Sequence, residues 1–154
     1  SVFGQTYRQY DCTRIFYTGE NVRPRFSQCD FAFTFDHLDD PRHYRLPLYA
    51  MYGDLNQLKL ENLQAPETVL REKTGFCNFI YSNGGKKTKK RNDFFHRLSK
   101  YKKVDSGGRH LNNIGGPVKD KRAFQQQYKF SIAFENSSYP GYTTEKIVDP
   151  MFAR

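Results

Sequence analysis

The fold is decided by one stretch of the chain, Phe134-Glu135-Asn136-Ser137-Ser138-Tyr139-Pro140-Gly141-Tyr142-Thr143-Thr144-Glu145-Lys146. An apolar run at 130–134 leads into it and predicts a strand, and a helix is predicted from Thr143 or Thr144. In α/β proteins, such a strand–loop–helix unit presents ligand groups at the carboxyl edge of a parallel sheet. The exposed N–H groups and the positive dipole end of the helix suit a phosphate.

Four polar side chains of this stretch are candidates for ligand binding. Glu145 and Lys146 are adjacent at the predicted helix start, and Asn136 and Tyr142 come before them. An ordinary strand-to-helix turn with a solvated charge pair explains the stretch equally well, so both interpretations stay open on these residues alone.

The bulk composition narrows the class of protein. The chain has 154 residues, of which 37% are hydrophobic and 16% aromatic, as expected for one domain or parts of two. Its net charge of +9 favours an anionic partner: a nucleic acid, a phospholipid surface or a phosphorylated small molecule. No apolar run approaches the ~20 residues of a membrane helix.

The cysteines give no sign of a metal or disulfide framework. Cys12, Cys29 and Cys77 form no CxxC pair, and the histidines are equally scattered. The chain begins without methionine and stops inside a predicted helix, so we expect a piece of a longer protein. The absence of a targeting segment then carries little information.

The N-terminal part predicts a short buried strand at 14–18. A second strand is predicted at 30–36, where the alternation of Phe with small residues indicates one densely buried face. Glu20 follows the first strand, where a carboxylate can act as a general base, although a solvated turn residue is the alternative. The pair Asp39-Asp40 indicates a solvated loop or helix start.

Residues 53–74 predict short helices and a crossing between domains. Their apolar positions are Leu55, Leu58, Leu63, Val69 and Leu70. Pro66 is expected to break the helical pattern, and we place a linker at 65–74.

The C-terminal part predicts half of a doubly wound α/β fold. The expected order is a strand at 76–82, a helix at 88–100, a strand at 102–105, a helix at 119–128, a strand at 129–134 and the final helix. Two loops between these elements carry charge. The basic run 86–91 lacks interleaved aromatic residues, which favours a solvated or membrane-surface patch over an RNA site.

The second loop is Ser106-Gly107-Gly108-Arg109. Its glycines are expected to let the backbone approach an oxyanion, and Arg109 can bind a phosphate bidentately. Because the loop follows a strand of the same predicted sheet, it should open on the same edge as the first stretch. The chain has neither a GxGxxG motif nor a Walker P-loop, which argues against a simple dehydrogenase or a P-loop kinase.

Several separated stretches together resemble the α1,3/α1,4-fucosyltransferases, glycosyltransferase family 10, and look more like bacterial members than animal Golgi enzymes. They are residues 16–21, 31–36, 45–49, 104–109, 128–136 and 142–146, in the order of the family. The resemblance implies an inverting enzyme that transfers L-fucose from GDP-β-L-fucose to a GlcNAc hydroxyl of a glycan.

The resemblance also implies a GT-B architecture, with two Rossmann-like domains that are both incomplete here. Residues 1–70 would be the later part of an acceptor-binding domain, and residues 71–154 the first half of a domain that binds GDP-fucose. We expect this 154-residue piece to be inactive by itself, since an incomplete donor domain leaves a sheet edge unpaired.

Matched to the family's motifs, Glu20 corresponds to the proposed general base. Arg109 and Lys146 correspond to the residues that neutralise the pyrophosphate. Asn136, Tyr142 and Glu145 correspond to residues that hold the nucleotide, its ribose or the fucose. No metal or other cofactor is expected. Pro150, inside the last predicted helix, is expected to kink it.

The remaining alternatives concern substrate and class. The chain could belong to a GT-B transferase for another GDP-sugar or acceptor, or to a non-catalytic protein that binds sugar nucleotides; nucleic acid is not expected as a partner. The expected acceptor is a glycan or lipopolysaccharide, on which bacterial members of the family make Lewis-type antigens, and peripheral membrane association is expected. The location would be cytoplasmic or at the inner membrane in a bacterium, and the Golgi membrane in a eukaryote.

Overall fold

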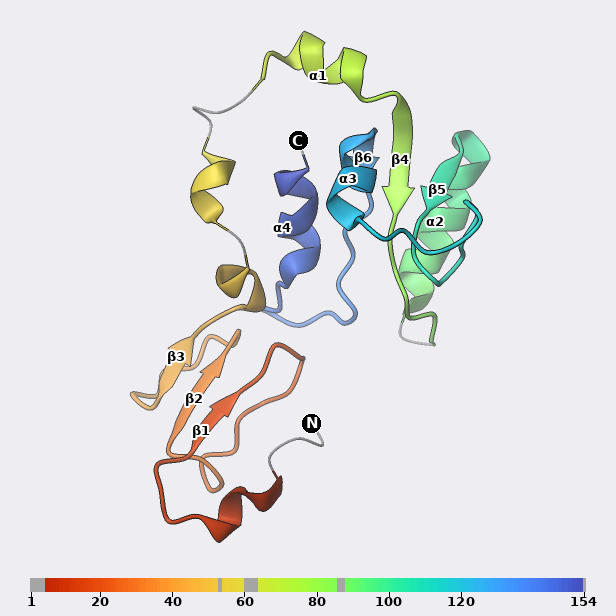
Figure 1. Ribbon diagram of the computed structural model, residues 1–154. Helices are drawn as coiled ribbons and strands as arrows, with labels where there is room; N and C mark the ends of the chain where they lie inside the picture. The colour runs from red at the N-terminus through yellow and green to blue at the C-terminus, as the bar shows by residue number, and fades with distance from the viewer. Residues whose placement is uncertain (1–4, 53, 60–63, 86–87, 154) are drawn as a thin grey trace.

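The computed structural model describes residues 5–52, 54–59, 64–85 and 88–153. Two three-stranded parallel sheets form two lobes, joined by short helices and by a long loop (Figure 1). No helix in this part of the chain combines the length and apolar character needed to cross a membrane.

The N-terminal sheet consists of β1 (Ile15–Tyr17), β2 (Phe31–Thr34) and β3 (His43–Arg45), in that order. The prediction of a buried first strand is wrong, because Ile15 is 60% exposed. In β2 the buried face carries the small residues Ala32 and Thr34, while Phe31 is 46% exposed. The phenylalanine alternation therefore marks the strand correctly but not the face that is buried.

The third strand was not predicted, since His43-Tyr44-Arg45 has no apolar pattern. It is placed by pairing with β2, with Ala32 opposite His43. The loop before it contains Asp40, which binds the Arg42 guanidinium at 2.8 Å, in agreement with the predicted loop.

The connection between the lobes is helical. It comprises the 3-10 helices η2 (Leu48–Met51) and η3 (Leu55–Leu58) and the helix α1 (Pro66–Glu72); a further 3-10 helix, η1 (Gln5–Gln9), precedes β1. Pro66 interrupts the helical pattern as predicted, because no helix runs through it. Pro66 is the first residue of α1, where the missing N–H is one that a helix leaves unused. Leu63, assigned to a short helix, lies outside the described residues.

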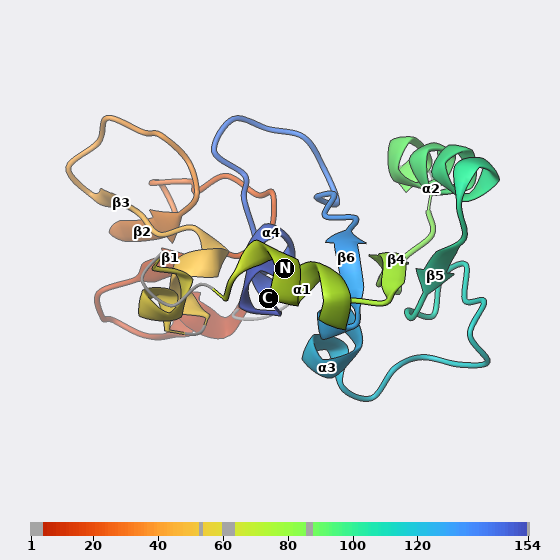
Figure 2. The same cartoon turned by 90° about the horizontal axis from the view of Figure 1, so that it is seen from above.

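The C-terminal sheet confirms the predicted β-α-β-α-β order. Its strands are β4 (Gly75–Phe79), β5 (Val104–Ser106) and β6 (Tyr128–Ser131), arranged β5-β4-β6 and all parallel. The crossovers are α2 (Lys89–Tyr101) and α3 (Lys121–Gln126), and α4 (Glu145–Phe152) follows β6. Figure 2 shows α2 on one face of the sheet and α3 on the other.

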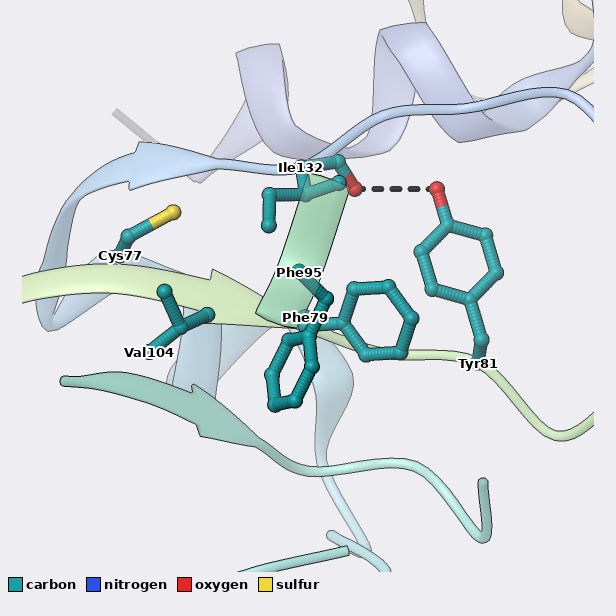
Figure 3. Packing of buried hydrophobic residues seen from close by; sticks show 6 residues of the cluster. All are labelled: Cys77, Phe79, Tyr81, Phe95, Val104 and Ile132. Carbon is teal, nitrogen blue, oxygen red and sulfur yellow. Dashed lines mark hydrogen bonds between the residues drawn. The ribbon is translucent and has the colours of Figure 1, made fainter. Parts of the chain in front are cut away.

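The core of this lobe is built around Phe79, which is fully buried. Its ring lies 4.6 Å from the Tyr81 ring and 4.8 Å from the Phe95 ring of α2, and Val104 of β5 belongs to the same cluster (Figure 3). Burying aromatic side chains of this size contributes about 2–3 kcal/mol each. The core thereby fixes α2 and β5 against β4.

Tyr81 connects this core to the edge of the sheet. Its hydroxyl accepts a hydrogen bond from the Phe134 amide at 2.6 Å and lies 3.0 Å from the Ile132 carbonyl, which ties down the end of β6. On the other side, a Cβ on Gly108 would overlap the Tyr81 carbonyl oxygen.

The glycines after β5 thus have a packing role. Gly107 and Gly108 are both buried, and the Gly107 amide donates to the Phe79 carbonyl at 2.9 Å. A Cβ on Gly107 would press on Phe124 and Val118. These glycines bring the backbone up to β4 and α3, while the approach of this backbone to an anion stays a prediction.

Replacing Gly108 by alanine should destabilise the protein by about 3 kcal/mol, because the Tyr81 backbone cannot move aside for a methyl group. The matched control is Gly85→Ala, whose Cβ meets no atom within 4 Å. Denaturant unfolding followed by circular dichroism gives both values. Equal stability of the two variants would contradict the close approach at Gly108.

Candidate functional site

The candidate site lies where loops of the two lobes meet. The loop from β6 to α4 reaches the N-terminal lobe (Figure 1), and Ser137 accepts a hydrogen bond from the Asn21 side chain at 2.7 Å. The Arg23 guanidinium lies over the Tyr139 ring, 3.6 Å from its centre. Gly141 has φ +81°, and a Cβ there would lie 2.7 Å from the Phe35 carbonyl oxygen, so only glycine allows this contact.

Two of the predicted site residues, Glu20 and Tyr142, come together from different lobes. Glu20 is exposed in the turn after β1, where its amide donates to the Thr18 hydroxyl at 3.0 Å. The Tyr142 side chain is buried, and the Glu20 carboxylate is near enough for its negative charge to raise the pKa of the Tyr142 phenol. The Tyr142 ring meets Phe35 edge-on, with the centroids 4.8 Å apart.

The environment of Tyr142 keeps its phenol neutral. Burial, followed by the negative charges of Glu20, Glu135 and Glu145, raises the pKa of Tyr142 to about 12. At neutral pH the hydroxyl therefore keeps its proton and can donate to a carboxylate.

The start of α4 is held by Glu135, a residue whose role the sequence did not reveal. Its carboxylate accepts from the Thr144 amide at 2.6 Å and from the Thr144 hydroxyl at 2.7 Å. Thr144 is itself the N-cap of α4, with its hydroxyl accepting from the Lys146 amide. A glutamate nine positions before an N-cap matches no local capping pattern, so only the folded loop identifies it.

Glu145 and Lys146 form a pair at this helix start. The Lys146 ammonium lies 3.0 Å from a Glu145 oxygen and 4.0 Å from a Glu135 oxygen. Burial alone would raise the pKa of Glu145, but the hydrogen bond and charge of Lys146 bring it below its ordinary value. The second Glu145 oxygen, Oε2, is buried without a hydrogen-bond partner among the described residues, so it can accept from a ligand hydroxyl.

Arg109 lies at the same edge but apart from this pair. Its side chain is exposed directly after β5, and the next residue, His110, donates its amide to the Tyr81 carbonyl at 2.9 Å. No hydrogen bond or ion pair joins Arg109 to the other candidates within the described ranges. The loops that carry Arg109 and Asn136 thus lie on either side of Tyr81. This agrees with the prediction that both loops open on the same edge of the sheet.

Asn136 is held by Arg91, which the sequence analysis assigned to a solvated basic patch. That assignment is wrong for Arg91: it is 2% exposed, and its Nη1 donates to Asn136 Oδ1 at 3.3 Å. Lys89 and Lys90 are exposed as predicted, and Lys86 and Lys87 lie outside the described residues. Spacing could have revealed the exception, because Arg91 precedes the buried Phe95 by four residues on one face of α2.

The last helix continues through Pro150 to Phe152, so the proline does not end it. Asp149 accepts from Lys121 at 2.6 Å, which links α4 to α3.

These groups suit a diphosphate with a neutral sugar attached. The cations Arg109 and Lys146 and the amide of Asn136 lie at the same edge of the C-terminal sheet. The carboxylate of Glu20 belongs to the other lobe. The described residues contain no cluster of three or more metal-ligating side chains. Two lobes built on parallel sheets, with such groups between them, are the arrangement of a GT-B fold over the part of that fold that the chain spans.

Comparison with known proteins identifies the family. Residues 1–52 match the domain described as "Alpha-(1,3)-fucosyltransferase FucT N-terminal domain", and residues 70–154 match "Glycosyltransferase family 10 (fucosyltransferase) C-term". The chain therefore belongs to glycosyltransferase family 10, the fucosyltransferases.

Individual relatives agree with this. The chain is 36% identical over 172 aligned residues to the alpha-(1,3)-fucosyltransferase FucT of Helicobacter pylori, covering 91% of this chain and 35% of that protein. Crystal structures of an alpha1,3-fucosyltransferase with GDP-fucose and with GDP each match with a TM-score of 0.75 and 33% identity, covering 93% of this chain and 51% of theirs. The chain thus spans about a third of the curated relative and about half of the solved structures.

Replacing Glu20 by glutamine should lower the pKa of Tyr142 from about 12, because it removes a negative charge that disfavours the phenolate. NMR titration of the tyrosine ring carbons measures the shift. Asp39→Asn is the matched control, since it removes an exposed carboxylate of the same lobe. An unchanged Tyr142 titration in Glu20→Gln would contradict the contact between the lobes.

Proposed function

We propose that the protein containing this chain transfers L-fucose from GDP-β-L-fucose to a GlcNAc hydroxyl of a glycan, in α1,3 or α1,4 linkage. The observation that carries the proposal is the hydrogen bond from the Asn21 side chain to Ser137 at 2.7 Å, since it holds the turn that carries Glu20 against the donor-binding stretch of the other lobe. Membership of the fucosyltransferase family and the likeness to structures titled with GDP-fucose and GDP support the choice of donor.

The proposed reaction is a single displacement at the anomeric carbon. Glu20 takes the proton of the acceptor hydroxyl while that oxygen bonds to the anomeric carbon. The bond from this carbon to the β-phosphate oxygen breaks on the opposite face, so the β-linked donor gives an α-linked product. Its electron pair leaves with GDP.

The leaving group is stabilised by charge. Arg109 and Lys146, together with the N-terminus of α4, would oppose the negative charge that grows on the diphosphate. In this structure the Lys146 ammonium bonds to Glu145 and Thr144, so a bound diphosphate would become an additional partner of an already oriented cation. The free Glu145 oxygen would accept from a hydroxyl of the ribose or the fucose.

The same proposal assigns the two lobes. Residues 1–70 would belong to the acceptor-binding domain and residues 71–154 to the donor domain. The proposed acceptor is a glycan of lipopolysaccharide, on which the transferred fucose would build a Lewis-type antigen, and the protein would lie in the cytoplasm or at the inner membrane of a bacterium. The exposed lysines Lys89 and Lys90 support attraction to an anionic surface.

Glu20→Gln should lower the turnover of fucose transfer by about 100- to 10,000-fold and leave GDP-fucose affinity unchanged, because the amide cannot accept the proton. The measurement uses the product of the complete gene that carries this chain, an N-acetyllactosamine acceptor, and calorimetry for the donor. Asp39→Asn serves as the control and should transfer normally. Unchanged turnover in Glu20→Gln would point to a non-catalytic protein or to a different base.

Lys146→Met should weaken GDP and GDP-fucose binding by about tenfold or more, since it removes a charged partner of the diphosphate. Lys121→Met, which removes the ion pair with Asp149 at the far side of α4, is the control. A donor panel completes the test: transfer from GDP-mannose, or none from GDP-fucose, would favour another sugar.

A further inference from the structure

Arg91 is a buried cation that the reaction above does not use. Its side chain is 2% exposed, its guanidinium carbon lies 3.8 Å from the centre of the Tyr81 ring, and its Nη2 donates to the Asn83 carbonyl at 2.5 Å. No carboxylate in the described part of the chain forms an ion pair with it. A buried charge without an opposite partner is costly, so its position calls for a role.

The second partner of Arg91 is Asn136, and the chemistry of the contact fixes the amide. A guanidinium has only donors, so the Asn136 oxygen must face Arg91, as the 3.3 Å contact from Nη1 to Oδ1 shows. The Asn136 Nδ2 then turns away from Arg91 with two N–H groups. Asn136 itself is only partly buried, at the edge where the donor would bind.

The positive charge of Arg91 also reaches the loop on the other side of Tyr81. Burial and then the charge of Arg91 lower the pKa of His110, the residue next to Arg109. His110 is positioned by Asn92, the neighbour of Arg91 on α2, at 3.0 Å. The first turn of α2 therefore supports both loops of the donor edge.

We propose that Arg91 is a positioning residue that locks the Asn136 amide with its oxygen inward, so that its N–H groups donate to an oxygen of the bound GDP-sugar. The inference rests on the proposed function for the identity of the donor. A purely structural alternative exists, in which Arg91 only caps the Asn83 carbonyl and packs under the loop. The two differ in how Arg91 and Asn136 combine their effects on donor binding.

A double-mutant cycle on the complete protein distinguishes the positioning role of Arg91 from the purely structural one. GDP-fucose affinity is measured by calorimetry for Arg91→Gln, Asn136→Ala and the double variant. We expect each single change to weaken binding by about tenfold and the double variant to be no weaker than the singles, because Arg91 acts through Asn136. Lys90→Gln, an exposed neighbour, should bind as the wild type does. The proposal would be overturned if the affinity losses of the two single variants multiplied in the double variant, or if Arg91→Gln bound GDP-fucose with wild-type affinity.

Asn136→Asp provides a second route if Arg91→Gln does not fold. The aspartate would give Arg91 an ionic partner, so thermal stability should be retained or raised, while GDP-fucose affinity falls by about tenfold because the N–H donors are gone. Wild-type affinity in this variant would overturn the proposal. If the unmodified protein does not bind GDP-fucose, the proposed function fails and the inference fails with it, whereas failure of the variants alone leaves the function intact.

Discussion

The arrangement of the donor edge depends on the contacts of Tyr81. Its backbone leaves no room for a side chain at Gly108, and its hydroxyl accepts a hydrogen bond from the Phe134 amide. The Arg91 guanidinium lies over its ring. Burial raises the pKa of this phenol to about 12, so its hydroxyl remains neutral while it bridges the strands. Tyr81, two residues after the end of β4, thereby contacts both the loop that follows β5 and the loop that follows β6.

The second constraint joins the lobes. Phe35, buried directly after β2, packs against Tyr142, and its carbonyl oxygen lies 2.7 Å from where a Cβ of Gly141 would be. Arg23 adds an ion pair to the buried Asp36 at 3.1 Å and lies over Tyr139. The loop from β6 to α4 is therefore held by the N-terminal lobe, close to the turn that carries Glu20.

The sequence predicted the C-terminal lobe better than the N-terminal one for a physical reason. Continuous apolar strands and amphipathic helices are local patterns, and they predicted the β-α-β-α-β order of this lobe. Strand β3 has no such pattern and exists only through pairing with β2. The candidate site could be located because Lys146 and Glu145 follow a strand and loop, whereas the roles of Glu135 and Arg91 arise from contacts with residues 9 and 45 positions away.

The central claim is that GDP-fucose binds at the carboxyl edge of the β5-β4-β6 sheet with Glu20 facing the anomeric carbon. A crystal structure of the complete protein with GDP-fucose tests it most directly. The account predicts diphosphate oxygens within about 3 Å of the Arg109 and Lys146 side chains, and the Glu20 carboxylate on the side of the sugar opposite GDP. A donor bound elsewhere, or Glu20 on the same side as the diphosphate, would contradict it.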